Sequence, residues 1–166
     1  RSCACCRTRL ILIDMDQVLL VDKPKEWTSF DVVGKVRYML RQATGQKIKV
    51  GHAGTLDPLA TGLLIVLVGK ATKRQDSFMK QDKVYEVEMK LGQTSTTADE
   101  EGEKTIVSDR QPTEEEVSEA VMSFLGVISQ VPPAYSAIKI GGQRAYKLAR
   151  AGKEVKIEPR TVSIHS

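Results

Sequence analysis

A glycine-rich stretch at residues 51–62, followed at once by an apolar run at residues 63–68, constrains the fold more than any other feature of this sequence. The stretch has three glycines, one proline and few bulky side chains, so it is predicted to form a tight loop. The run that follows is apolar throughout and has the length of a strand, which predicts a buried strand. The chain is therefore expected to pass from an open loop directly into its core.

Local patterns predict further elements on both sides of this loop. A short apolar run at residues 17–21 predicts a strand, and a turn is expected at residues 22–24. Ser29 is expected to cap a helix whose apolar residues keep helical spacing, with Gly45 as its stop. Residues 70–79 are predicted to be helical. Residues 84–91 alternate between apolar and charged, with Tyr85 on the apolar face, which predicts a strand.

The second half of the chain mixes short elements without a regular repeat. Residues 93–104 are polar and acidic and are expected to form a loop. Thr113 and Glu116 have the spacing of a capping box, which predicts an amphipathic helix that stops at Gly126. A strand, a Gly-Gly turn and a short helix are predicted across residues 137–150, with a last strand at 161–164. The predicted class is α+β, a mixed and mostly antiparallel sheet flanked by helices.

Composition excludes several classes of protein. The 166 residues are 41% apolar and 28% charged, as in a globular chain of one domain, and no run approaches the roughly 18 apolar residues of a membrane span. The three cysteines at positions 3, 5 and 6 do not have the spacing of a zinc site. Residues 1–16 are predicted to be a leader, disordered or non-native, and residues 17–166 the domain. The cysteine usage predicts a cytoplasmic protein.

Charge is unevenly distributed along the chain. Residues 134–166 contain seven Lys or Arg and two acids, a local net charge of +5, whereas residues 99–119 have a local net charge of −7. This segregation is typical of a protein with a basic face for a polyanion, although many such faces are only solvated surfaces.

The glycine-rich stretch presents few chemically active side chains. Asp57 precedes Pro58, which favours an extended backbone, and His52 is the only imidazole nearby. Neither a metal site, a Ser/His/Asp triad nor a phosphate-binding Walker loop fits these residues. By its residues alone, an aspartate in such a turn is most often structural.

The same stretch nevertheless resembles the signature loop of the bacterial tRNA pseudouridine synthase B family. Twelve consecutive residues carry the resemblance, from Gly51 through Asp57 and Pro58 to Gly62. Other segments follow in the family's order, and the resemblance extends over residues 17–164. These segments are Asp22-Lys23-Pro24 with Trp27-Thr28-Ser29, Tyr85-Glu86, residues 132–139, and Arg144-Ala145-Tyr146.

The resemblance implies a pseudouridine synthase-like catalytic domain that converts a uridine to pseudouridine in the T loop of tRNA, at position 55. It implies that Asp57 is the catalytic residue, that Tyr85 stacks on the flipped-out base, that His52 lies near that nucleotide and that Lys23 supports the loop. It also implies the RNA contacts Lys139, Arg144, Lys147 and Arg150. Because the reaction neither oxidises nor hydrolyses its substrate, no metal and no organic cofactor are expected. The expected partner is the T-arm of tRNA, and no obligate protein partner and no membrane contact are expected.

Two departures from the family pattern affect these expectations. Glu26 stands where the first motif usually has glycine. In the family that this chain resembles, the catalytic domain continues beyond the position of Ser166 into a motif whose arginine pairs with the catalytic aspartate. The resemblance therefore implies a domain that is truncated at its C-terminal end. The chain alone is therefore expected to be weakly active or inactive, with an uncovered sheet edge. Two alternatives stay open: a non-catalytic tRNA-binding or tRNA-folding module, and a structural α+β domain without a role in RNA.

Overall fold

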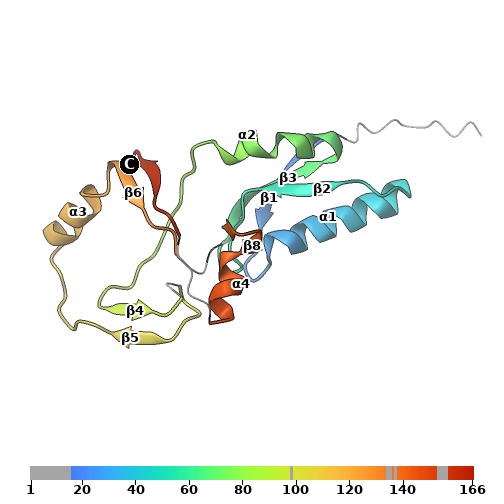
Figure 1. Ribbon diagram of the computed structural model, residues 1–166. Helices are drawn as coiled ribbons and strands as arrows, with labels where there is room; N and C mark the ends of the chain where they lie inside the picture. The colour runs from blue at the N-terminus through green and yellow to red at the C-terminus, as the bar shows by residue number, and fades with distance from the viewer. Residues whose placement is uncertain (1–15, 98, 134–135, 137, 153–156) are drawn as a thin grey trace, which may run out of the picture. The chain divides into compact units, whose positions relative to one another are not determined.

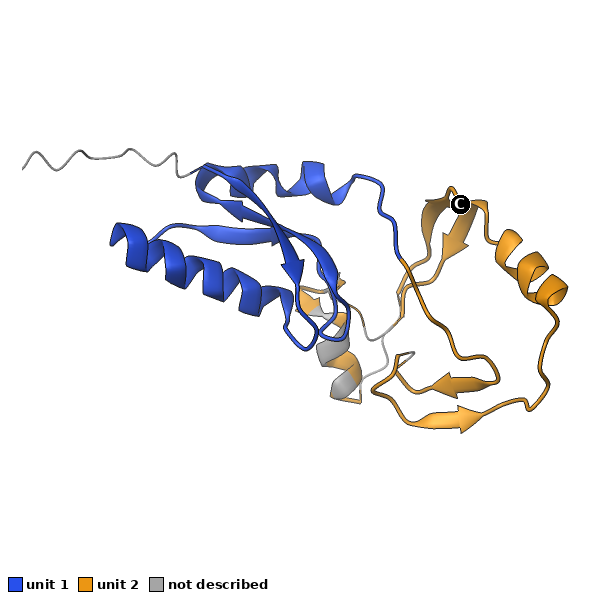
Figure 2. Cartoon of the chain, turned by 180° about the vertical axis from the view of Figure 1, so that it is seen from behind, with its two compact units in different colours: residues 1–85 blue, residues 86–166 orange. Residues whose placement is uncertain are grey.

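The computed structural model describes residues 16–97, 99–133, 136, 138–152 and 157–166. The chain divides into two compact units, Arg1–Tyr85 (unit 1) and Glu86–Ser166 (unit 2), which are coloured separately in Figure 2. Each unit is described by itself. No helix among the described residues is long and apolar enough to cross a membrane.

Unit 1 is built on a three-stranded antiparallel sheet. Its strands β1 (Val18–Lys23), β3 (Gly62–Val68) and β2 (Val50–Ala53) lie in the order β1-β3-β2. The buried strand predicted at residues 63–68 is confirmed as the central strand. The predicted loop is shorter than expected and covers residues 54–61, because the first residues of the glycine-rich stretch pair with β3 and satisfy their backbone groups there.

Helix α1 (Ser29–Thr44) follows β1 and ends at Gly45, whose φ of 70° is the left-handed stop expected from the sequence. Its N-cap is Thr28, one residue before the predicted cap. The Thr28 hydroxyl accepts a hydrogen bond from the Asp31 N–H, and the Asp31 carboxylate accepts one from the Thr28 N–H. This capping box satisfies the first turn of the helix, so the Ser29 side chain is left for another partner.

The core of unit 1 forms on both faces of the sheet (Figure 1). Alternate residues of β3 point to opposite faces, so Leu64 and Val66 pack with α1, and Leu67 packs on the other face. That second face is covered by the 3₁₀ helix η1 (Gly69–Arg74) and by α2 (Gln75–Met79), which confirms the helical prediction for residues 70–79. A strand covered on both faces explains the unbroken apolar run.

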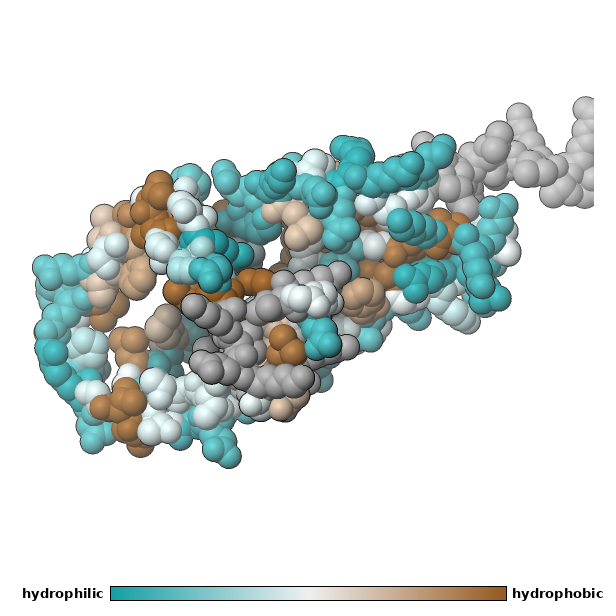
Figure 3. All heavy atoms as spheres, in the orientation of Figure 1, coloured by the Kyte–Doolittle hydropathy of each residue, from teal (hydrophilic) through white to brown (hydrophobic). Residues whose placement is uncertain are grey.

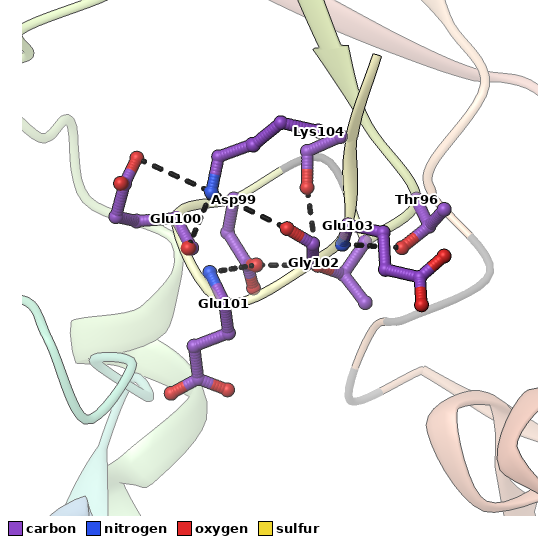
Figure 4. Close-up of polar contacts among 9 residues, drawn as sticks. Thr96, Asp99, Glu100, Glu101, Gly102, Glu103 and Lys104 are labelled. Atoms are coloured by element: carbon purple, nitrogen blue, oxygen red, sulfur yellow. Dashed lines mark hydrogen bonds and ion pairs between the residues drawn. The ribbon is translucent and has the colours of Figure 1, made fainter.

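In unit 2, β4 (Gln93–Ser95) and β5 (Lys104–Ile106) form a hairpin where a loop was expected. Figure 4 shows the polar contacts that close it. The Thr96 N–H donates to the Glu103 carbonyl at 3.1 Å, and the Glu103 N–H donates to the Thr96 hydroxyl at 3.1 Å. Lys104 reaches back to Glu100 at 3.5 Å. The acidic composition concealed this hairpin because the acidic residues lie in the connection between the two strands and not in the strands themselves.

The remaining elements of unit 2 are short. Helix α3 (Glu114–Met122) has the predicted capping box between Thr113 and Glu116, but it ends before Gly126. Strand β6 (Gly126–Gln130), which the sequence did not predict, pairs with β9 (Arg160–Ile164). The predicted strand and short helix are confirmed as β7 (Lys139–Ile140) and α4 (Ala145–Arg150), and the turn between them leads first into β8 (Gln143–Arg144), a strand that was not predicted and that pairs with β7. Figure 3 shows apolar residues on the surface of this unit.

The strand predicted at residues 84–91 is not formed. Residues 82–90 have no regular secondary structure, and their apolar side chains are exposed, Tyr85 to 68%. Alternation provides one apolar face, but a strand also needs a neighbour for its backbone N–H and C=O groups, and no described strand pairs with this segment. The α+β class with antiparallel pairing is confirmed, as one three-stranded and three two-stranded sheets among the described residues.

Candidate active site

The loop at residues 54–61 presents Asp57 at one end of the sheet of unit 1. The loop leaves β2 after Ala53 and enters β3 at Gly62, so both of its ends are fixed by strand pairing. Asp57 is exposed, and its carbonyl accepts a hydrogen bond from the Ala60 N–H at 3.1 Å, which closes a turn. The loop therefore offers a carboxylate to solvent from a defined backbone turn.

Lys23 anchors this loop from inside the protein. It is 0% exposed, and the strand register places it directly opposite Gly62, where the loop returns to the sheet. Its Nζ donates to the carbonyls of Trp27 at 2.7 Å, Pro24 at 3.0 Å and Pro58 at 3.2 Å. An ammonium group has three donors, so all of them are used. A buried charge is costly without partners, and here three carbonyl dipoles provide them.

The backbone on both sides of Asp57 is held by the segment that precedes α1. The Glu26 N–H donates to the Pro58 carbonyl at 2.7 Å, beside the Lys23 contact. Ser29 contacts Leu56 through its hydroxyl, which donates to the Leu56 carbonyl at 3.1 Å and accepts from the Leu56 N–H at 3.0 Å. The residues immediately before and after Asp57 are therefore both held by hydrogen bonds from the segment that precedes α1.

Among the residues that the structure describes, Glu26 is the only non-glycine residue with a positive φ, which is 70°. This left-handed conformation suits glycine, because a side chain there crowds the backbone and costs about 1–2 kcal/mol. The structure thus gives a physical reason for the usual glycine at this motif position. The Glu26 N–H donates to the Pro58 carbonyl in this strained conformation, so the residue keeps a contact with the Asp57 loop.

His52 lies on β2 and not in the loop. Its Nδ1 contacts the Gly54 carbonyl. Because a carbonyl only accepts, Nδ1 is the donor in this contact. The Phe30 ring packs edge-on against the imidazole, with the ring centroids 5.3 Å apart and the planes at 88°. The imidazole is therefore held in orientation by contacts on two sides.

The structure does not bring every predicted site residue to the loop. Tyr85 lies in the irregular segment at residues 82–90, and no hydrogen bond or ring contact among the described residues joins it to the Asp57 loop. The predicted RNA contacts lie in unit 2, in β7, β8 and α4, and their side chains are outside the described part of the structure. These are Lys139, Arg144, Lys147 and Arg150.

A basic surface of unit 1 was not foreseen from the sequence. It comprises Lys49, Lys70 and Lys73, all exposed, and the Gly69 N–H donates to the Lys49 carbonyl at 2.8 Å, which places the start of η1 beside Lys49. Asp16 pairs with Lys70 at 3.4 Å. The surface adjoins the end of β3 opposite the Asp57 loop. The missed signal is two short basic segments, residues 47–49 and 70–74, which together contain five Lys or Arg and no acid.

Metal chemistry has no candidate ligands in the part of the chain that the structure describes. No group of three or more His, Cys, Asp or Glu there could hold a metal ion.

A surface hollow of about 530 Å³ lies along the start of α1, lined by Glu26, Trp27, Phe30, Asp31, Gly34 and Lys35. It does not include Asp57.

The sequence and structure were compared with known proteins. Residues 41–166 match the N-terminal domain of the TruB family pseudouridylate synthases. The tRNA pseudouridine synthase B of Parabacteroides distasonis is 49% identical over 150 residues, which cover 89% of this chain and 64% of that protein. The protein of the same name from Clostridium kluyveri is 45% identical, over 92% of this chain and 51% of its own length. The protein of the same name from Thermobifida fusca is 48% identical, over 90% of this chain and 50% of its own length.

A solved structure supports the fold independently. A chain in the crystal structure of a Cbf5-Nop10-Gar1 complex superposes on 90% of this chain, and on 33% of its own length, with a TM-score of 0.52 and 23% identity. At that identity the likeness concerns the fold alone. The present chain spans about half to two thirds of the length of the curated relatives described above. The family match covers most of the chain and includes the Asp57 loop, and this chain therefore belongs to the TruB pseudouridylate synthase family.

Proposed function

We propose that this chain is part of an enzyme that isomerises a uridine of tRNA to pseudouridine, in the T loop at position 55, with the Asp57 carboxylate as the catalytic group. The observation that carries the proposal is an exposed aspartate whose two neighbours, Leu56 and Pro58, are held by the buried side chains of Ser29 and Lys23. Its loop lies within the region that matches the family. A solvated surface aspartate needs no such framework, whereas a catalytic group needs a defined position.

The chemistry fits a carboxylate. The uracil must leave C1′ of the ribose, turn over and rejoin through carbon, and an ionised carboxylate serves as a nucleophile or as a base toward the sugar. The base must first leave its stack. Tyr85 is exposed and available as a flat surface on which the base can rest, and such stacking contributes roughly 1–3 kcal/mol per base. His52, whose Nδ1 contacts the Gly54 carbonyl, lies on the strand that leads into the loop.

The proposed partner is tRNA, and unit 1 offers it a phosphate-binding surface. Strand β3 has seven residues, and its six rises of about 3.3 Å separate the Asp57 loop from Lys49 and Lys70 by roughly 20 Å. An RNA whose uridine lies at Asp57 would thus have room for phosphate contacts at this surface. Basic contacts of this kind make affinity fall steeply with salt. We extend the proposal to Lys139, Arg144, Lys147 and Arg150 of unit 2, to residues 17–166 as part of one catalytic domain, and to a cytoplasmic location.

The proposal is tested by mapping pseudouridine in a tRNA transcript incubated with the protein. The 166-residue chain and a form extended to the length of its relatives are each compared with their Asp57→Asn variants, and Asp109→Asn, at an exposed aspartate of unit 2, is the matched control. We expect new pseudouridine in the T loop with the extended form and with Asp109→Asn, and none with Asp57→Asn, while tRNA binding is retained by all.

Two results would overturn the proposal. Modification by the Asp57→Asn protein would move the chemistry to another residue. Salt-sensitive tRNA binding without modification by any form would replace the isomerase with a tRNA-binding module.

A further inference from the structure

Ser29 has a buried role that helix formation does not explain. It is the first residue of α1 and is 2% exposed. The capping box of that helix is complete without it, because Thr28 and Asp31 satisfy the first turn. A serine at the start of a helix normally points to solvent or caps the helix. Here the hydroxyl turns inward to a residue 27 positions away, Leu56.

The contact between Ser29 and Leu56 is reciprocal. The hydroxyl donates to the Leu56 carbonyl at 3.1 Å and accepts from the Leu56 N–H at 3.0 Å. One side chain therefore satisfies both backbone polar groups of the residue that precedes Asp57. Removing the hydroxyl would leave both of these part-buried groups without this partner, so the loop would have to move or admit water.

The contacts of Ser29 complement those on the other side of Asp57. The Pro58 carbonyl accepts from the Glu26 N–H at 2.7 Å and from Lys23 Nζ at 3.2 Å. The planar peptide group before Asp57 contains the Leu56 carbonyl, which Ser29 holds, and the one after it contains the Asp57 carbonyl, which accepts from the Ala60 N–H at 3.1 Å. Because both groups are held, the φ and ψ of Asp57 have little freedom. The segment at residues 23–29 thus holds Asp57 by its two neighbours, and the Asp57 side chain stays exposed to solvent.

We propose that Ser29 is a positioning residue for Asp57, which it holds through the backbone of Leu56. This inference rests on the proposed function, in which the Asp57 carboxylate reacts at C1′ of the uridine. A misplacement of about 1 Å in a reacting group costs up to about 100-fold in rate. Ser29 does not need to touch the substrate, so its loss affects the rate of the chemical step and not the affinity for tRNA.

The test compares Ser29→Ala with Thr28→Ala. The two variants change neighbouring residues at the start of the same helix, but the described side-chain hydrogen bonds of Thr28 go to Asp31, and those of Ser29 go to Leu56. Amide hydrogen exchange is measured on the 166-residue chain, and kcat and KM for tRNA on the form that shows turnover. In Ser29→Ala we expect the Leu56 amide to exchange at least about tenfold faster and kcat to fall about 10–100-fold with KM unchanged. In Thr28→Ala we expect Leu56 to stay protected and kcat to stay nearly unchanged.

Each result decides a separate claim. Unchanged protection of Leu56 in Ser29→Ala, or an equal loss of kcat in Thr28→Ala, would overturn the positioning role. A rise in KM with constant kcat would assign Ser29 to RNA binding and would also contradict it. Absence of turnover in every wild-type form would overturn the proposed function and with it the catalytic meaning of Ser29, and the exchange data would still decide whether Ser29 holds the loop.

Discussion

Units 1 and 2 contain the same kinds of local structure and differ in what those elements bury. The two hydrophobic clusters that the structure describes both belong to unit 1, on opposite faces of its three-stranded sheet. In unit 2, the described sheets have two strands each, and apolar residues such as Val127 of β6 stay in solvent. Hairpins of two strands are marginal alone, whereas three strands with a covered face are stable. Capping boxes and turns thus form locally, but a core needs a third strand and a cover.

The largest expected difference between the units concerns leucine side chains. Leu64 of β3 is 1% exposed, and Leu91 of unit 2 is 52% exposed. We expect Leu64→Ala to lower the free energy of unfolding by about 3 kcal/mol, because it leaves a cavity between the sheet and α1. Leu91→Ala should lower it by less than about 1 kcal/mol. Urea unfolding followed by circular dichroism measures both, and equal losses would refute the difference in burial.

The buried ammonium of Lys23 gives the next largest effect. Lys23→Met removes three hydrogen bonds to carbonyls and leaves Pro24, Trp27 and Pro58 without this donor, but it also removes the cost of burying a charge. We expect the lost hydrogen bonds to outweigh the removed cost of burial, so that the free energy of unfolding falls by about 2–3 kcal/mol. Lys104→Met, which breaks an ion pair with the exposed Glu100 in unit 2, should change stability by at most about 0.5 kcal/mol. An unchanged free energy of unfolding in Lys23→Met would show that the Lys23 hydrogen bonds add nothing to stability.

The smallest effects concern the two capping boxes, which have the same chemistry in different units. Thr28→Ala should cost roughly 1 kcal/mol in global unfolding, because α1 covers the core of unit 1. Thr113→Ala removes the matching cap of α3, whose residues are exposed. It should fray α3 with little change in global stability. Amide exchange of the first turn of each helix, measured beside urea unfolding, separates fraying from unfolding.

The same boxes predict a weak dependence on pH. The Thr28 hydroxyl and N–H lower the pKa of Asp31 below its usual 3.8, and the Thr113 N–H and the Arg110 guanidinium lower the pKa of Glu116 below 4.5. A lowered folded-state pKa means that the stabilisation is complete above the unfolded pKa and is lost as pH falls through the folded value. Helix capping should therefore weaken only in acid, below about pH 4. Carboxyl chemical shifts in an acid titration check the direction, and a raised pKa would contradict it.

Features that depend on neighbours in sequence could be predicted. The central strand β3, the stop of α1 at Gly45 and the Thr113 capping box follow from spacing over a few residues. The strand expected at residues 84–91 was wrong because pairing is decided by a distant partner that alternation does not reveal. The cap of α1 was misplaced by one residue because Thr28 and Ser29 are both good caps, and the Asp31 spacing distinguishes them.

The site divides in the same way. The sequence marks Asp57 through its glycine-rich surroundings, and the family resemblance assigns its role. The three carbonyls around Lys23 and the Ser29 contact with Leu56 could not be predicted, since they depend on the register of β1 with β3 and on the exact start of α1. The sequence thus predicts Asp57 as the reacting side chain, and the structure describes the framework that holds its loop.

The most direct measurement of the central claim is tritium release from tRNA that carries uridine labelled at carbon 5, because forming the new bond at this carbon displaces its hydrogen. The wild-type chain, its form extended to the length of its relatives, and the Asp57→Asn variant of each are assayed together. We expect tritium release by the extended wild-type form, weak or no release by the 166-residue chain, and none by either Asp57→Asn variant. Release that persists in Asp57→Asn, or no release from any form that binds tRNA, would contradict it.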